Sequence, residues 1–152
     1  MKIKKFKSRR LTVLEANIDD MNPEWYEPLM ERLFQAGALD VTLTPVVMKK
    51  GRPAIVLSVL SLPRKRNQLL NILFEESTTL GVRSHSVERF ELDRSVVTVK
   101  TPYGTVSLKL GRDGSGEIRN VAPEFESCHK IAKEKKLPLQ EVYRAALAAF
   151  KS

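Results

Sequence analysis

Hydrophobic and polar positions alternate along the first sixty residues in a way that predicts three strands. Residues 11–17 are mostly apolar and predict a buried strand. Residues 39–47 alternate apolar with polar side chains, the two-residue period of a half-buried strand. Residues 54–60 are rich in β-branched side chains, which favour a third strand.

A helix is predicted between the first two of these strands. Asn22 suits the N-cap and Pro23 the first helical position, while Gly37 marks the end. Pro28 lies inside this span, where it removes a backbone donor and crowds the preceding turn. The regular part of the helix is therefore expected to begin later than Pro23.

The pattern then repeats a helix and a strand. Residues 63–77 carry an apolar stripe at helical spacing, and residues 83–93 predict an exposed strand that is polar on one face. The order strand, helix, strand, strand, helix, strand is that of the ferredoxin-like split βαβ fold.

The last third of the chain adds further elements. Residues 96–100 and 106–110 flank a turn with Pro102 and Gly104, which predicts a hairpin. A short strand near Ile118 is followed by two helices, over residues 123–136 and 138–150. The predicted fold class is α+β: a ferredoxin-like βαββαβ core with an added β-hairpin and two C-terminal helices.

Composition and charge refine this picture. With 152 residues and 42% hydrophobic content, the chain is long enough for one globular domain, assigned to residues 11–152. The net charge is +8, but six of the positive charges lie in residues 1–10, predicted to be a basic flexible arm. The single cysteine, Cys128, favours a reducing, cytoplasmic setting, and no apolar run has membrane-spanning length.

Two adjacent carboxylates follow the first strand. Asp19 and Asp20 are of the type that Mg²⁺ or Mn²⁺ uses beside phosphate oxygens and water. Both reach one metal only if the strand has already ended at Ile18, because neighbouring strand residues face opposite ways. The alternative is that the two aspartates cap the coming helix and complement its positive end.

Two further segments suit phosphate groups. Lys49, Lys50 and Arg52 share a tight loop that can aim several cations at one polyphosphate, although from sequence alone a solvated hairpin loop is the more common explanation of such residues. Residues 78–83 offer the hydroxyls of Thr78 and Thr79 and the guanidinium of Arg83, or else simply end a helix.

Two other charged residues are ambiguous on pattern alone. Arg89 lies in the predicted exposed strand, and Glu124 is placed to complement a helix N-terminus. No arrangement of nucleophile, base and acid is recognisable, so the catalytic residues stay unknown.

Five segments together resemble the LarC family. They occur in the family's order and cover about residues 11–150, corresponding to its C-terminal half. The segments are Asn17-Ile18-Asp19-Asp20-Met21, residues 31–41 with Ala36-Gly37-Ala38, Met48-Lys49-Lys50-Gly51-Arg52-Pro53, Thr78-Thr79-Leu80-Gly81-Val82-Arg83, and residues 121–128 with Pro123-Glu124-Phe125-Glu126.

The resemblance implies a function. Such proteins are nickel-insertion enzymes, or cyclometallases of the lyase class, that place nickel into the pyridinium bis-thiocarboxylate mononucleotide of the nickel-pincer cofactor used by lactate racemase. The C-terminal half of the family is similar to a ferredoxin-like module that binds CTP with Mn²⁺ or Mg²⁺ and self-associates as a trimer or hexamer. CTP cleavage to CMP and diphosphate accompanies nickel insertion.

The resemblance also implies roles for individual residues. Asp19 and Asp20, with Glu124 in addition, are expected to hold the divalent metal. Lys49, Lys50 and Arg52 are expected at the triphosphate, and Thr78, Thr79, Arg83 and Arg89 elsewhere on the nucleotide. The family's N-terminal half, with its histidine-rich segment, has no counterpart in this sequence, so nickel insertion is expected to need that half as a partner.

Two other functions compete with this interpretation. Ferredoxin-like palms with strand-end aspartates also serve nucleotidyl transfer. A pure RNA-binding module would use the basic arm and loop, but surface aromatic residues are not interleaved with those cations. The resemblance therefore favours a small-molecule site, with neither nucleic acid nor membrane as partner.

Overall fold

A computed structural model describes residues 6–151 and groups them into two compact units. One unit is Ser8–Arg89, and the other combines residues 6–7 with residues 90–151. The sequence pattern predicted a single domain over residues 11–152. Hydrophobic periodicity identifies elements but does not show which of them share a core, and here they build two cores.

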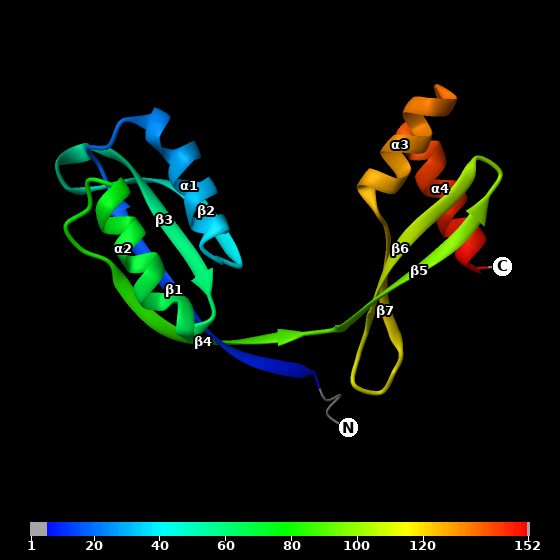
Figure 1. The fold of residues 1–152 in the computed structure, drawn as a ribbon, viewed down its shortest axis with the longest axis horizontal. Helices are drawn as coiled ribbons and strands as arrows, with labels where there is room; N and C mark the ends of the chain where they lie inside the picture. The colour runs from blue at the N-terminus through cyan, green and yellow to red at the C-terminus, as the bar shows by residue number, and fades with distance from the viewer. Residues whose placement is uncertain (1–5, 152) are drawn as a thin grey trace. The chain divides into compact units, whose positions relative to one another are not determined.

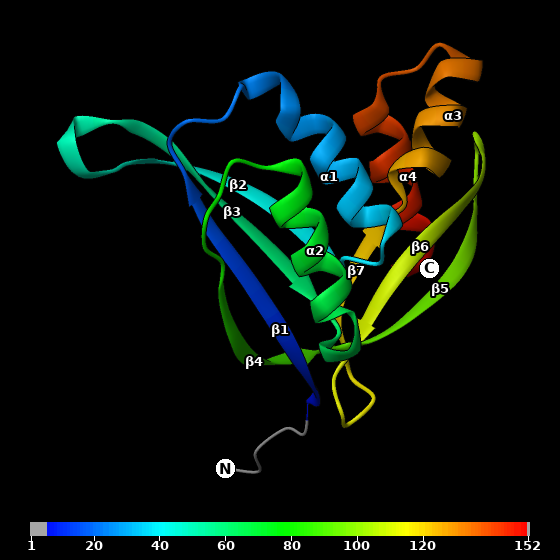
Figure 2. The ribbon, with the colours of Figure 1, turned by 60° about the vertical axis from the view of Figure 1, so that its left-hand side comes forward.

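The first unit is a four-stranded sheet covered by two helices (Figures 1 and 2). The strands lie in the order β2-β3-β1-β4, and β1 pairs antiparallel with β3, as β3 does with β2. The elements in chain order are β1 (Lys7–Ile18), η1 (Pro23–Trp25), α1 (Tyr26–Gln35), β2 (Asp40–Val47), η2 (Lys49–Gly51), β3 (Pro53–Ser61), η3 (Pro63–Lys65), α2 (Arg66–Glu76) and β4 (Arg83–Glu91).

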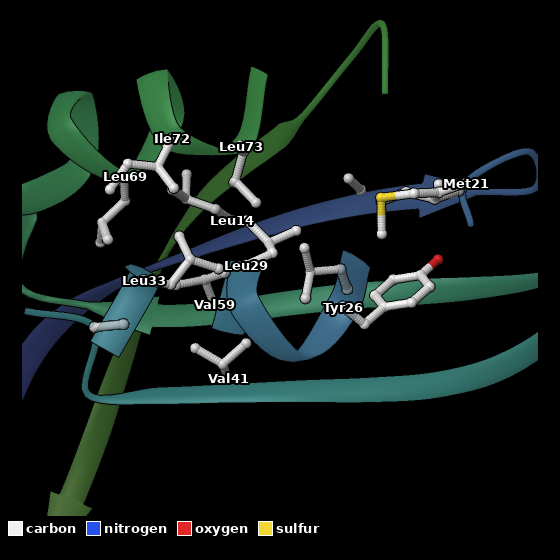
Figure 3. Close-up of a cluster of buried hydrophobic side chains, with 14 residues drawn as sticks. Leu14, Met21, Tyr26, Leu29, Leu33, Val41, Val59, Leu69, Ile72 and Leu73 are labelled. Atoms are coloured by element: carbon white, nitrogen blue, oxygen red, sulfur yellow. The ribbon is translucent and has the colours of Figure 1, made fainter. Parts of the chain in front are cut away.

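The core of this unit lies between the sheet and its helices. The register aligns Leu14, Val59 and Val41 across three strands, and all three side chains are buried. Leu29 and Leu33 of α1, with buried leucines of α2, pack against them (Figure 3). Burial of these side chains on one face of the sheet fixes the strand register, because a shift of one residue would turn them to the other face.

The start and end of the first helix follow from particular residues. The side chain of Asn22 accepts a hydrogen bond from the backbone N–H of Glu24 at 3.0 Å, as predicted for an N-cap. A 3₁₀ turn intervenes, so Pro28 falls in the first turn of α1, where its missing N–H would have no helical partner. Gly37 ends the helix at φ +101°, a conformation that other residues rarely adopt.

The second unit has its own sheet and core. Strands β5 (Asp93–Thr101), β6 (Gly104–Arg112) and β7 (Ile118–Pro123) form an antiparallel sheet in that order. Helices α3 (Phe125–Lys135) and α4 (Leu139–Lys151) follow, and the core combines Val106 and Leu108 of β6 with Val142 of α4. Cys128 belongs to this core, where burial raises the pKa of its thiol.

The α+β class is confirmed, and the predicted elements are present with different bounds in places; Pro123, for example, ends β7 and α3 begins at Phe125. Residues 83–93 are divided between β4 and β5, and β1 begins at Lys7, so part of the predicted basic arm is strand. Residues 1–5 of that arm lie outside the described residues. Within residues 6–151, no helix combines the length and the apolar character needed to cross a membrane.

Candidate functional site

Three segments of the first unit meet at one end of its sheet. The pairing of Ile18 with Ile55, and of Val47 with Pro53, places the end of β1 beside the β2–β3 loop. The loop between α2 and β4 joins them through side-chain contacts. Three contacts connect residues separated by 33, 58 and 66 positions in sequence.

The first contact pairs Asp19 with the basic loop. Nη1 of Arg52 donates to Oδ2 of Asp19 at 3.1 Å, and the side chains are 54% and 19% exposed respectively. The carboxylate is thus the more enclosed member of the pair. In this arrangement the guanidinium supplies the positive charge beside Asp19.

The second contact engages Asp20. The hydroxyl of Thr78 donates to Oδ1 of Asp20 at 2.5 Å. The pKa of the Tyr26 phenol, at the start of α1, is raised mainly by burial and additionally by the negative charge of Asp20. Asp20 therefore faces a neutral donor, whereas Asp19 faces a cation.

The two aspartates are not the caps of the first helix. β1 ends at Ile18, so both aspartates lie in the bend that follows the strand. Outside a regular strand, neighbouring side chains are not forced to opposite faces, so both can reach one ligand. The N-cap is Asn22, and the described carboxylate contacts of Asp19 and Asp20 go to Arg52 and Thr78. The N-cap part of the alternative is therefore wrong for these two residues, while a role in complementing the positive end of the helix stays a prediction.

The third contact extends the site onto the sheet. Nη2 of Arg83 donates to Oδ1 of Asn17 at 2.7 Å, and its Nε lies 3.9 Å from the carboxylate of Glu15. Sequence reasoning did not single out Asn17 or Glu15 as site residues. The available signal was their alternation with buried Leu14, Ala16 and Ile18, which puts two polar side chains on the opposite face of β1.

The basic loop has an unusual backbone. Lys50 has φ +64° and Gly51 φ +69°, and the backbone N–H of Met48 donates to the carbonyl of Arg52 at 2.8 Å across the turn. Lys49, Lys50 and Arg52 are all exposed. The predicted cations therefore project from one short, closed connection.

Thr79 plays a different part from Thr78. Its side chain is buried, and its hydroxyl donates to the carbonyl of Gly81 at 2.9 Å. This bond lies within the loop between α2 and β4. Thr79 thus shapes the loop that contains Thr78 and leads to Arg83 of β4, while its own hydroxyl bonds to the backbone.

Two further predicted residues take no part in these three contacts. Arg89 is half-buried and lies further along β4 than Arg83. Glu124 belongs to the second unit, just before α3, and its carboxylate pairs with Nζ of Lys109 at 3.0 Å. Within either unit, among residues 6–151, no three His, Cys, Asp or Glu side chains cluster. A metal role for Glu124 stays a prediction.

The donors at this end of the sheet suit hard cations and phosphates. Carboxylates, a hydroxyl and an amide oxygen are the ligand types of Mg²⁺ and Mn²⁺. Exposed lysine and arginine side chains are the usual partners of phosphate oxygens. The site thus combines both chemistries in an α+β domain with a ferredoxin-like half.

Comparisons with known proteins place the chain in a family. A family model described as nickel insertion protein matches residues 1–143. The chain therefore belongs to the nickel insertion protein family. It is 49% identical over 139 residues to the pyridinium-3,5-bisthiocarboxylic acid mononucleotide nickel insertion protein of Thermotoga petrophila, covering 91% of this chain and 35% of that protein. The protein of the same name from Clostridium kluyveri is 48% identical over 132 residues, covering 87% and 33%.

Solved structures agree with the fold. LarC2, described as the C-terminal domain of a cyclometallase involved in the synthesis of the NPN cofactor of lactate racemase, matches with a TM-score of 0.87 and 35% identity, over 96% of this chain and all of that one. A protein of Methanopyrus kandleri matches with a TM-score of 0.72 and 25% identity, over 95% and 91%. The chain spans about a third of the length of the curated relatives it matches.

Proposed function

We propose that this chain is the CTP- and divalent-metal-binding part of an enzyme that inserts nickel into pyridinium-3,5-bisthiocarboxylic acid mononucleotide. The observation that carries the proposal is the convergence of three family-typical segments through the Arg52–Asp19, Thr78–Asp20 and Arg83–Asn17 contacts. Membership of the nickel insertion family supplies the nickel chemistry. Nickel is the substrate metal, distinct from the ion that accompanies the nucleotide.

Asp19 and Asp20 would hold the nucleotide's Mn²⁺ or Mg²⁺. Such ions take one or two protein carboxylates and complete their shell with phosphate oxygens and water, so two adjacent aspartates in a bend match the requirement. When bound, the ion supplies neutralisation of the triphosphate charge. The residues of this chain do the rest: they position the phosphates and hold the loops.

Lys49, Lys50 and Arg52 would bind the triphosphate. Their loop gives two mobile ammonium groups and one planar guanidinium, and all three are exposed to solvent. Thr78 and Arg83 would contact the phosphates or ribose, while Thr79 holds the loop that contains Thr78. Preference for cytosine, and cleavage of CTP to CMP and diphosphate, belong to the same proposal through the family resemblance.

Nickel insertion itself would need more chain than this. The relatives are about three times longer, so the substrate mononucleotide and the nickel would be handled together with the remaining part of the enzyme. The nucleotide domain would act in that complex, as a homo-oligomer. Its own property, testable on this chain, is metal-dependent nucleotide binding.

Replacing Arg52 by Ala tests the triphosphate assignment. The variant should lose about 1.5–3 kcal/mol of CTP affinity, the size of a charge-assisted hydrogen bond, while CMP affinity hardly changes. Calorimetry in the presence of Mn²⁺ measures both. An equal loss for CMP and CTP would show that the loop holds the base or only shapes the fold.

A further inference from the structure

We propose that Arg52 couples metal binding to phosphate binding by exchanging partners. With no divalent cation bound, Arg52 neutralises Asp19; when a cation takes that place, the released guanidinium binds the triphosphate. This inference rests on the function proposed above and concerns how the two ligands of that site depend on each other.

The geometry of the ion pair makes Arg52 an exchangeable group. One guanidinium nitrogen lies 3.1 Å from one carboxylate oxygen, and the arginine side chain is 54% exposed. Water competes for the exposed guanidinium, whereas the more enclosed Asp19 carboxylate still needs a positive partner when Arg52 leaves. Arg52 can therefore leave at small cost when a cation takes its place at Asp19, and neither residue belongs to the buried cluster around Leu29.

A divalent cation and the guanidinium cannot share Asp19 on equal terms. A cation in contact with the Asp19 oxygens would put like charges a few ångströms apart, which disfavours keeping Arg52 in place. The displaced guanidinium has five N–H donors and matches phosphate oxygens bidentately. Since Arg52 lies in the same loop as Lys49 and Lys50, release adds a third phosphate donor to that loop.

Asp20 lacks this property. Its described partner is the neutral hydroxyl of Thr78, which can keep one carboxylate oxygen while the other binds a cation. The two adjacent aspartates thus differ in the partner that metal binding must displace. Only at Asp19 does cation binding release a charged side chain.

Linkage makes the effect reciprocal. If the cation raises triphosphate affinity by freeing Arg52, the triphosphate must raise cation affinity by the same factor, because it holds Arg52 away from Asp19. Removing the guanidinium should then act in opposite directions. Binding of the cation alone should strengthen, and binding of the nucleotide with the cation should weaken.

The experiment compares Arg52→Gln with Lys50→Gln, each made in the 152-residue chain. Both substitutions remove one positive charge from the same loop and leave the same polar glutamine side chain, but of the two residues Arg52 is the one that touches Asp19. Binding of Mn²⁺ alone is followed by electron paramagnetic resonance of the free ion, without nucleotide. Binding of CTP with Mn²⁺ is followed by calorimetry.

The exchange predicts a difference between these two variants. Arg52→Gln should bind Mn²⁺ alone about two- to fivefold more tightly than Lys50→Gln does, the factor set by an exposed ion pair. Both variants should bind CTP with Mn²⁺ less tightly than the parent. The cooperativity between Mn²⁺ and CTP should fall in Arg52→Gln and stay closer to the parent in Lys50→Gln.

Other results would overturn the exchange. Equal or weaker binding of Mn²⁺ alone by Arg52→Gln than by Lys50→Gln would do so, as would no measurable binding of Mn²⁺ alone by any variant while the parent binds CTP with Mn²⁺. Failure of the parent itself to bind CTP in the presence of Mn²⁺ would instead contradict the proposed function. A melting temperature near that of the parent confirms that each variant is folded.

Discussion

Substituting Asp19 or Asp20 by Asn separates metal binding from structural support. Asparagine keeps an acceptor oxygen and nearly the same shape but lacks the charge that a divalent ion requires. Asp19→Asn weakens an ion pair whose arginine is 54% exposed, and Asp20→Asn keeps an oxygen for the Thr78 hydroxyl. Neither aspartate belongs to the buried cluster around Leu29.

The magnitude follows from these contacts. A partly exposed ion pair is worth about 0–1 kcal/mol, so Asp19→Asn should lower the melting temperature by a few degrees at most. The same limit applies to Asp20→Asn if its amide oxygen keeps the Thr78 bond. We expect at least one of the two variants to abolish Mn²⁺-dependent CTP binding.

Asn22→Ala is the matched control. It removes the side-chain acceptor of the Glu24 N–H, which costs about 0.5–2 kcal/mol, without touching Asp19 or Asp20. It should lower the melting temperature while leaving CTP affinity at saturating Mn²⁺ close to that of the parent. Scanning calorimetry and titration calorimetry measure the two effects. If both aspartate variants bind CTP with Mn²⁺ as the parent does, the carboxylates are structural and the metal assignment is wrong.

The remaining predictions concern stability. Leu29→Ala empties a fully buried position of the first unit and should cost about 2–5 kcal/mol in chemical denaturation; a loss below 1 kcal/mol would contradict the described core. The hydrogen bond from Ser115, and backbone bonds from Ser115 and Glu117, lower the pKa of Asp113 against the opposing effect of burial. Because the pKa is lowered in the folded state, ionised Asp113 stabilises the fold above pH 3.8, its ordinary pKa, and this stabilisation is lost as the pH falls. Asp113→Asn should therefore flatten the acid limb of a profile of melting temperature against pH. An unchanged slope would refute this.

The sequence predicted most elements because local signals agreed with the final packing. Asn22 and Pro23 start the first helix and Gly37 ends it, and the alternation over residues 39–47 became β2. Pro28 looked like a conflict only because the preceding 3₁₀ turn could not be seen in the pattern. The grouping into two compact units is not visible in the pattern, because an apolar stripe does not reveal which element it will pack against.

The site was predicted as residue types and not as contacts. Asp19, Arg52 and Thr78 were selected for their chemistry, but their pairing depends on the register of β1 with β3 and on the positive φ of Lys50. A loop conformation of this kind leaves no periodic pattern in the sequence from which it could be predicted. Asn17 was predicted only as part of a family motif. Its contact with Arg83 depends on β1 and β4 being neighbours in the sheet, which the sequence pattern does not show.

Metal-dependent selection of one nucleotide tests the central claim most directly. The four ribonucleoside triphosphates are titrated by calorimetry into the parent chain, each with Mn²⁺ and each with EDTA. The account predicts that CTP binds in the presence of Mn²⁺, that the other three bind more weakly, and that affinity is lost in EDTA. Tight binding of ATP and CTP alike in EDTA would contradict both the metal site and the assignment of the nucleotide.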